Sequence, residues 1–595
     1  MQKTPFLSPT PTRFLDNVRK GRILALLRRG ELALVFLAIA CGLLAGLAVA
    51  AIGFLSRFLH ASIFGVQGSL SGSALSAPVV VLGPLAGGVI LGMIVLVLSR
   101  WRKKPMRDPI EANALYGGRL SLTDSLIVCL QNIVSNGFGA SVGLEAGYTQ
   151  VASAIASKIG TIVKLRRGDM RILVGCGAAG AIAAAFDAPL TATFYAIELI
   201  IGTYTVMTLT PVIVAALTAK LVIDQIATKG LTISLEASGP LSHSDYGPAI
   251  LLGLVCGGLG ILLMQAVSSV EALARRSRLP TAVRPALGGL VVGLLALISP
   301  QVLSAGHGAL HINMEASVGV ATLSGLLLLK ATASAVSLGS GFRGGLFFAS
   351  LLMGALIGKI FALMLGALDP ALFLPVQVYA VIGMSAFAAA VIGGPLAMTF
   401  LALEMTGDFE ITLLVLAAVI AASLLVRITF GYSFATWRFH LRGETIRSAH
   451  DVGWVRDLTV SRLMRADVRT AERNLDLETF RTLYPLGSTQ RVVIVDTDGR
   501  YAGLIHVPEV YTDLTDRPDT NPSLDRFISH TDDLLLPGMN IKQAAALFEE
   551  GQSEALVVVN NLIDRKPIGL LTESHTLRRY SEELEQRRRE VSGEM

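Results

Sequence analysis

The sequence carries little charge and little cysteine for its length. Only 16% of its 595 residues are Asp, Glu, Lys or Arg, whereas 52% are hydrophobic and 59 are glycine. A soluble globular protein of this size needs more charged surface, so the composition indicates a membrane protein. The four cysteines lie in apolar segments without paired spacing, which argues against disulfides and against a metal site.

Motifs that carry enzymatic chemistry are missing as well. We find no nucleophile with a neighbouring base, no cluster of metal ligands and no phosphate-binding loop in the sequence. We therefore do not expect an enzyme, and we expect no required cofactor. The net charge of +6 fits basic loops beside a membrane and needs no nucleic acid as a partner.

Long apolar blocks recur along the chain and predict a polytopic α-helical membrane protein. About 20 residues of helix cross a bilayer, and several blocks reach that length. Others are shorter or are interrupted by Gly and Pro, which is typical of half-helices that line a cavity. The blocks span residues 32–60, 76–99, 121–135, 171–200, 204–224, 247–267, 285–299, 318–335, 346–367, 371–405 and 412–428.

The two ends of the chain differ from this apolar region. Residues 1–31 are rich in Lys and Arg, so we expect this N-terminal segment in the cytoplasm. The apolar run from Leu32 is too long for a cleavable signal peptide. Charged residues are dense again from Arg442, which predicts a membrane domain at 32–440 and a cytoplasmic tail at 444–595. We expect an integral protein of a bacterial inner or plasma membrane.

Two segments of the membrane domain repeat each other. The segments GAAGAIAAAFDAPLTATFYAIE at 177–198 and GMSAFAAAVIGGPLAMTFLALE at 383–404 are identical at nine of 22 positions. Upstream, GFGASVGL at 137–144 corresponds to GSGFRGGL at 339–346. Small residues also recur wherever helices pack closely, but the shared pattern P-L-x-x-T-F-x-A-x-E points to duplication.

The duplicated halves cover about residues 30–230 and 245–440. Duplicated halves with broken helices are typical of transporters and channels, whose binding site lies between the halves near the middle of the membrane. The second repeated segment ends in Glu404 and the first in Glu198. Because both carboxylates have the same local setting, we expect Glu198 to hold a helix end.

One carboxylate, Glu145, stands among glycines and small residues where a helix begins. An ionisable residue at membrane depth is a candidate functional residue. The alternative is a first-turn Glu that only complements the helix dipole. The glycines around it let the backbone approach a bound group closely, so we favour an ion site.

These motifs resemble the CLC family of chloride channels and proton-coupled chloride exchangers. The stretch Gly-Leu-Glu-Ala-Gly at 143–147 is similar to the family motif G-[KR]-E-G-P, and Gly-Leu-Phe-Phe-Ala at 345–349 to G-x-F-x-P. AAAFDAPL at 183–190 and LEMTGDFE at 403–410 also look like family signatures. The resemblance implies a homodimer in which each subunit has its own pore and helix N-termini face the anion.

The resemblance also implies roles for particular residues. Glu145 matches the gating glutamate, whose carboxylate occupies an anion site until it swings away or is protonated. The implied anion-binding residues are Gly143, Leu144, Ala146, Leu346, Phe347 and Phe348.

Three positions depart from the family pattern. Met106 stands where the anion-coordinating serine is expected, and a thioether cannot donate a hydrogen bond. Ala435 takes the place of the central tyrosine; Tyr432, one turn away, is either its substitute or an anchor at the membrane interface. Leu199 replaces the internal proton-accepting glutamate of family exchangers, which favours passive conduction.

Arg343 directly precedes two glycines, Gly344 and Gly345. It either raises the anion concentration at a vestibule through its field or is a loop cation at the membrane surface.

The tail contains two copies of one pattern, at 456–511 and 526–580. Each copy has a polar segment, an apolar strand, a second strand and a helix, and the pair resembles CBS domains. Some such pairs bind adenine nucleotides, and the corresponding positions here are Glu509, Thr572 and His575. Because the nucleotide signature is weak, we expect a structural, dimer-stabilising tail, with nucleotide binding as the alternative.

Taken together, these features predict a chloride channel gated by Glu145, with an α-helical inverted-repeat membrane domain and an α/β CBS-like tail. The alternative is a proton-coupled chloride or fluoride antiporter. Met106 and Ala435 are similar to the fluoride-exporting branch of the family, but that branch usually lacks such a tail, so chloride is the expected ion. The expected partners are a second copy of the chain, the bilayer and inorganic anions.

Overall fold

The computed structural model describes residues 31–66, 68–73, 75–101, 106–226, 242–368, 374–441, 458–512 and 523–592. The chain divides into two units, Met1–Asp451 and Val452–Met595. Apart from Glu31, the predicted N-terminal segment lies outside the described residues. So does Pro105, which precedes Met106 in the sequence.

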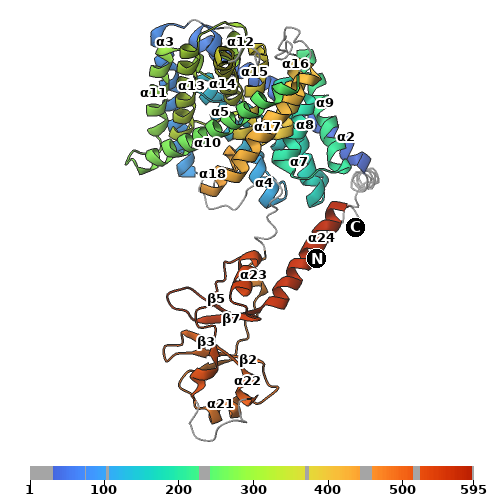
Figure 1. Cartoon of the computed structure of the whole chain (residues 1–595), viewed down its shortest axis with the longest axis vertical. Coiled ribbons are helices and arrows are strands. Elements are labelled where there is room, and N and C mark those ends of the chain that lie inside the picture. The colour runs from blue at the N-terminus through green and yellow to red at the C-terminus, as the bar shows by residue number, and fades with distance from the viewer. Residues whose placement is uncertain are drawn as a thin grey trace, which may run out of the picture. The chain divides into compact units, whose positions relative to one another are not determined.

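The first unit is helical, as the apolar blocks predict (Figure 1). Within the described residues, eight helices are long and apolar enough to cross a membrane. The first repeat contains α2 (Glu31–Phe64), α3 (Ala77–Trp101), α4 (Pro109–Tyr116), α5 (Leu122–Gly137), α6 (Glu145–Val163), α7 (Arg167–Phe186), α8 (Pro189–Tyr195), the π-helical turn η2 (Ala196–Ile201) and α9 (Val206–Ile226). The second contains α10 (Tyr246–Arg276), α11 (Arg284–Ile298), α12 (His307–Glu315), α13 (Val320–Ser340), α14 (Phe347–Leu368), α15 (Val376–Ile392), α16 (Pro395–Thr406) and α17 (Phe409–Thr429), and α18 (Phe434–Leu441) follows.

Two of the apolar blocks are each broken into two helices at equivalent positions. The breaks fall between α7 and α8 and between α15 and α16. Asp187 (φ 57°) and Gly393 (φ 89°) end the first helix of each pair in the left-handed region, and a proline starts the second helix two residues later. Proline disfavours helical geometry at the residue before it. The first helix therefore ends and a new helix begins at the proline in both repeats.

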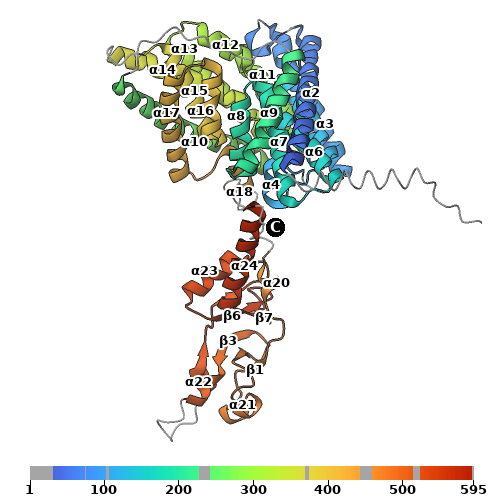
Figure 2. The same cartoon turned by 90° about the vertical axis from the view of Figure 1, so that its right-hand side faces the viewer.

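The two repeats pack internally in the same way. α2 contacts α7 and α9, and α10 contacts α15 and α17, their counterparts. The repeats join through α3 with α11 and through α8 with α16, which lie side by side in both cartoon views (Figures 1 and 2). Both junctions pair a helix with its own counterpart, as a two-fold relation between duplicated halves requires. The predicted fold class is therefore confirmed.

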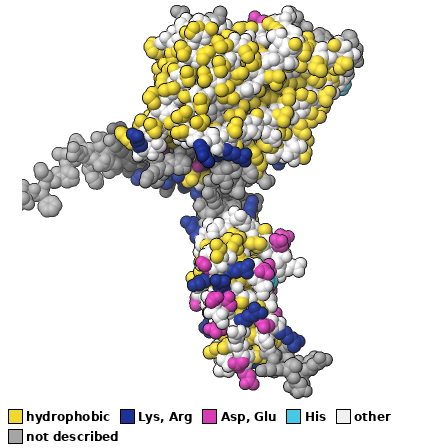
Figure 3. Space-filling model, turned by 90° about the vertical axis from the view of Figure 1, so that its left-hand side faces the viewer, with side chains coloured by type: hydrophobic (Ala, Val, Ile, Leu, Met, Phe, Trp, Pro, Cys, Tyr) yellow, Lys and Arg dark blue, Asp and Glu magenta, His cyan; other side chains and the backbone are white. Residues whose placement is uncertain are grey.

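The outer face of this unit is largely hydrophobic, with Lys and Arg along one edge (Figure 3). Large apolar side chains such as Leu32, Val206 and Leu368 are at least three-quarters exposed. Side chains of this kind are stable in contact with lipid rather than water, so the surface is that of an integral membrane protein.

The second unit is an α/β structure in which one element order occurs twice. The first copy contains β1 (Thr470–Glu472), α21 (Leu477–Leu483), β2 (Arg491–Val495), β3 (Tyr501–His506) and α22 (Val507–Thr512). The second contains β5 (Leu534–Leu535), α23 (Ile541–Glu550), β6 (Ala555–Val559), β7 (Pro567–Thr572) and α24 (Glu573–Ser592). In each copy the first two strands are parallel and the next pair is antiparallel, and β4 (Ile528–Ser529) adds to β3. This architecture is compatible with a CBS pair, whose assignment stays a prediction.

Candidate functional site: a cavity at the junction of the repeats

The two repeats meet at a pair of glycines. The Gly143 N–H donates to the carbonyl of Gly345 at 2.9 Å, and the Gly345 N–H donates back to Gly143 at 3.2 Å. Each glycine stands two residues before the first residue of a helix, Glu145 of α6 and Phe347 of α14. The bridge therefore brings the N-terminal ends of these two helices together, although they are about 200 residues apart in the sequence.

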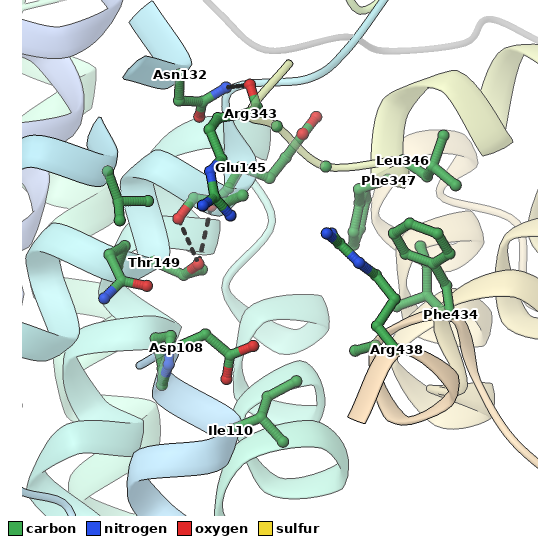
Figure 4. Close-up of a pocket in the computed structure, with 18 of the residues that line it drawn as sticks. Asp108, Ile110, Asn132, Glu145, Thr149, Arg343, Leu346, Phe347, Phe434 and Arg438 are labelled. Atoms are coloured by element: carbon green, nitrogen blue, oxygen red, sulfur yellow. Dashed lines mark hydrogen bonds between the residues drawn. The ribbon is translucent and has the colours of Figure 1, made fainter. Parts of the chain in front are cut away.

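The Glu145 carboxyl group lies against both glycines. A Cβ atom on Gly345 would be 3.2 Å from Oε2 of Glu145, and a Cβ on Gly143 would collide with the same carboxyl group. A side chain at either position would therefore require the Glu145 carboxyl group to shift. Figure 4 shows the Glu145 side chain extending away from Asp108, which lies elsewhere on the cavity wall.

The surroundings of this carboxyl group differ from those of an ordinary helix cap. Glu145 is 5% exposed, and within the described part of the chain its Oε2 has no hydrogen-bond partner. The backbone N–H groups of Glu145 and Phe348, from the first turns of α6 and α14, face the carboxyl group. The carboxylate therefore occupies a position at which converging helix N-termini favour a negative charge.

Asn132 on α5 fixes the geometry of the junction. Its amide nitrogen donates to the carbonyls of Gly143 (2.9 Å) and Arg343 (3.0 Å), and its amide oxygen accepts from the Gly147 N–H at 2.8 Å. One buried side chain thus binds backbone from both repeats. Asn132 was not predicted from the sequence, although a polar residue in the apolar block 121–135 was a usable signal.

A buried lysine also acts on Glu145. Lys330 on α13 is fully buried and donates to the carbonyls of Val302 (3.0 Å) and Ser304 (2.8 Å). Its positive charge acts on the Glu145 carboxylate electrostatically. The sequence analysis missed this residue too, although a single lysine within the apolar run LSGLLLLKATASAV is unusual at membrane depth.

A cavity of about 420 Å³ adjoins the glycine junction. Figure 4 shows residues of both repeats and of α18 around it. Eight of the side chains singled out in the sequence line it: Met106, Glu145, Ala146, Leu199, Arg343, Leu346, Phe347 and Ala435.

The remaining membrane-domain candidates lie elsewhere. Gly143 forms the bridge, and Leu144 packs against the cluster that contains Cys129. Phe348 stacks on His307, with ring centroids 3.6 Å apart, and lines a second cavity of about 290 Å³.

Tyr432 is not part of the cavity wall. Its ring packs against Phe430 and Trp437, at centroid distances of 6.3 and 5.5 Å. Tyr432 therefore does not line this cavity, and its role as a substitute for the tyrosine or as an interface anchor stays a prediction. The physical reason is that residue 432 precedes α18, so it does not share the face of that helix that carries Ala435.

The cavity wall also carries charged and polar groups that the sequence analysis did not select. Asp108 caps α4 by accepting from the Glu111 N–H at 2.8 Å. The Arg107 guanidinium lies 3.4 Å from the centre of the Tyr116 ring. The other additional polar residues on the wall are Asn132, Thr149, Gln150, Tyr195, Glu271, Arg275 and Arg438.

The three candidate nucleotide residues lie in different copies of the tail. Glu509 is on α22, with its carboxylate 3.9 Å from Nδ1 of His506. Thr572 ends β7, and His575 lies in the first turn of α24 with Nδ1 3.1 Å from the Arg578 guanidinium. Partial burial, followed by the charges of the neighbouring arginines, lowers the pKa of His575, so its neutral form is favoured.

Comparison with known proteins agrees with this architecture. A family model described as "Voltage gated chloride channel" matches residues 87–427. A protein of Ralstonia nicotianae named "Putative chloride channel protein ClcB-like" is 32% identical over 371 residues, which cover 61% of this chain and 86% of that protein.

Two solved structures share the fold. One, described as a slow cyanobacterial Cl⁻/H⁺ antiporter, has a TM-score of 0.60 and 21% identity and covers 70% of this chain and 98% of its own. The other, described as a eukaryotic CLC transporter, has a TM-score of 0.59 and 18% identity. It covers 93% of this chain and 98% of its own. At these identities the likeness concerns the fold alone.

Proposed function

This chain belongs to the voltage gated chloride channel family, the CLC family of anion transporters, and we propose that it is a passive chloride channel gated by Glu145. One observation carries the proposal. The Glu145 carboxyl group sits between Gly143 and Gly345, where two helix N-termini meet beside a cavity. A transported anion would bind to the same backbone N–H groups, so the ionised carboxylate competes with the anion for them.

The gate opens when the carboxylate leaves this position. Protonation removes its charge and its competition with the anion, and the side chain is then free to move. Backbone N–H groups hold an anion without a full positive charge in direct contact, and a weak site releases what it binds. Chloride as the transported ion accords with the names of the bacterial relatives.

Leu199 supports passive conduction. It lines the cavity together with other apolar side chains, Ile200, Val391 and Ile392. A proton crossing this stretch finds no carboxylate at position 199. Chloride movement without stoichiometric proton movement follows.

Proton-coupled antiport is the second candidate, and a specific residue favours it. Asp108 lines the same cavity as Glu145 and carries a carboxyl group that binds and releases protons. Water in a cavity of about 420 Å³ is able to connect the two carboxylates. In this alternative Asp108 supplies the inner proton-binding carboxylate that is missing at position 199.

The deciding experiment measures chloride and protons together. The protein is reconstituted into liposomes loaded with chloride, a potassium ionophore clamps the voltage, and chloride and external pH are recorded. If the protein is a channel, we expect chloride efflux without a proton uptake that stays in fixed ratio to it. Steady proton uptake driven by the chloride gradient establishes antiport instead, and Asp108→Asn then shows whether Asp108 carries the proton.

We propose further that the protein is a homodimer and that its tail is cytoplasmic. The tail is mainly structural in this proposal, and the alternative is that it binds an adenine nucleotide. The repeated β-α-β-β-α order supports a pair of CBS-like units. The basic N-terminal segment supports an orientation with both ends of the chain in the cytoplasm. Size-exclusion chromatography with light scattering measures the oligomeric state.

A further inference from the structure

Tyr195 is a polar side chain on the cavity wall that the proposed mechanism does not yet use. It is the last residue of α8, is half-buried, and lines the same cavity as Glu145. Its ring packs against Phe347, with centroids 6.0 Å apart and planes tilted by 58°. Among the described residues its hydroxyl has no hydrogen-bond partner. The ring is therefore held in place while the hydroxyl remains available.

The uncharged polar neighbours of Tyr195 on this wall already donate to protein acceptors. Asn132 donates to two backbone carbonyls, and the Thr149 hydroxyl donates to the carbonyl of Glu145 at 2.9 Å. The Gln150 amide donates to the Arg107 carbonyl at 2.9 Å and to Ser125 at 3.0 Å. These three side chains would have to break a hydrogen bond before they could bind an anion. Tyr195 would not.

The wall offers few other neutral side-chain donors. Met106, Leu199 and Ala435 have no side-chain N–H or O–H group. Among the cationic groups, Arg107 is stacked on Tyr116, and Arg275 is 3.6 Å from Glu271. A neutral hydroxyl differs from these guanidinium groups because it binds an anion by one hydrogen bond without a full charge.

The electrostatic setting of the phenol also suits this role. Tyr195 lines the same cavity as the carboxyl groups of Glu145 and Asp108. A tyrosine hydroxyl keeps its proton at neutral pH. The anion therefore meets a donor whose charge state does not change when the gate titrates.

We propose that the Tyr195 hydroxyl donates a hydrogen bond to the transported anion inside the cavity, and so helps to set anion affinity and selectivity. This inference rests on the proposed transport function. A single neutral hydrogen bond gives modest affinity, which permits release. Small anions with concentrated charge, such as chloride, gain more from it than larger ones with spread charge, such as nitrate.

The test is Tyr195→Phe, which removes the hydroxyl and keeps the ring against Phe347. Tyr432→Phe is the matched control, because it removes one hydroxyl from a ring outside the cavity wall. Chloride affinity is measured by calorimetry on purified protein, and chloride and nitrate efflux are measured from liposomes. We expect the chloride Kd of Tyr195→Phe to rise about tenfold, equivalent to about 1.4 kcal/mol, and the chloride-to-nitrate flux ratio to fall.

The outcomes separate this inference from the proposed function. If the wild-type protein moves no anion, the proposed function fails. If the wild type moves chloride but Tyr195→Phe keeps its Kd and flux ratio, only the anion contact is overturned. A change in proton movement alone, with unchanged chloride affinity, also overturns the anion contact and assigns the hydroxyl to proton transfer between Glu145 and Asp108. An equal loss in Tyr432→Phe contradicts a site-specific role.

Discussion

Glu198 and Glu404 cap each other's neighbouring helices across the junction of the two repeats. The Glu198 carboxylate accepts from the N–H groups of Leu396 and Ala397, both at 3.0 Å, at the start of α16. The Glu404 carboxylate accepts from the N–H (2.9 Å) and the hydroxyl (2.6 Å) of Thr191, at the start of α8. The predicted role of Glu198 in holding a helix end is confirmed. Each carboxylate stabilises the N-terminus of a helix in the opposite repeat.

This reciprocal arrangement predicts a loss of stability when either carboxylate is removed. Glu198→Ala and Glu404→Ala each leave backbone N–H groups unpaired inside the membrane domain, at a cost of about 1–3 kcal/mol per donor. Thermal unfolding of the purified protein in detergent measures the effect, and both variants are expected to melt at lower temperature. Comparable losses are expected, because each carboxylate also accepts from a hydroxyl group, that of Tyr204 for Glu198 and that of Thr191 for Glu404.

The control is Glu410→Ala, because Glu410 lies near the start of α17 and is exposed. It is expected to retain the wild-type melting temperature. A pair of Glu198 and Glu404 variants that also melt like the wild type would contradict the reciprocal cap.

The sequence predicted the fold because duplication and hydropathy are local signals. The repeat also aligns the glycines at 143 and 345, whereas the residues that follow them were identified through the family resemblance. Asn132 and Lys330 were missed because their roles depend on carbonyl groups contributed by distant segments, which no local pattern reveals. Tyr432 lies outside the cavity wall because it precedes α18, and the sequence does not mark where that helix begins.

Asp108 and Tyr195 show a second limit. In the sequence Asp108 has the pattern of an ordinary N-cap before proline, and in the structure it caps α4. Tyr195 reads as an apolar helix residue. The second role proposed for each depends on α4 and α8 bordering the same cavity as α6 and α14, which is a property of the tertiary packing.

The coupling prediction concerns the carboxylates of the cavity. In a passive channel, Asp108→Asn leaves chloride flux without proton movement, as in the wild type, because no proton passes through Asp108. Leu199→Glu adds a carboxyl group to the cavity wall and is expected to reduce chloride flux at neutral pH through repulsion. Ion-selective electrodes record chloride and pH together in liposomes. Proton movement that is present in the wild type and absent in Asp108→Asn would reverse the assignment to antiport.

The tail prediction concerns nucleotides. With the weak signature at Glu509, Thr572 and His575, ATP, ADP and AMP are expected to bind no tighter than the high micromolar range, equivalent to roughly 5–6 kcal/mol. Calorimetry on the full-length protein measures this, and His575→Ala is the matched variant. Low-micromolar ATP binding that His575→Ala abolishes would establish a nucleotide site.

The pH dependence of any such binding follows from His575. Its pKa is lowered below the ordinary value, so the imidazole is neutral at pH 7 and gains its positive charge only as the pH falls. A bound phosphate favours the charged form, so binding is expected to strengthen between pH 7 and pH 5.5. His575→Gln, which does not titrate, is expected to bind with an affinity that does not change over this range.

The last prediction concerns Glu145 as the gate. Its carboxyl group lies where two helix N-termini converge, with Lys330 acting on it from within the protein. While it is ionised, it holds the position that an anion requires. Protonation removes that charge, so chloride flux is expected to rise on acidification. Glu145→Gln keeps the size of the side chain without the charge, and it is expected to give high flux at neutral pH and a flattened pH response in liposome efflux.

Two further variants distinguish a gate from a structural cap. Glu145→Ala vacates the position between Gly143 and Gly345, so it is expected to conduct like Glu145→Gln and to bind one additional chloride in calorimetry. Lys330→Met removes a buried ammonium group that donates to the carbonyls of Val302 and Ser304, so the pH response of chloride flux in this variant measures whether that group affects the gate. If the Glu145 variants fold and keep the wild-type pH dependence, Glu145 only terminates a helix and the gate is another group.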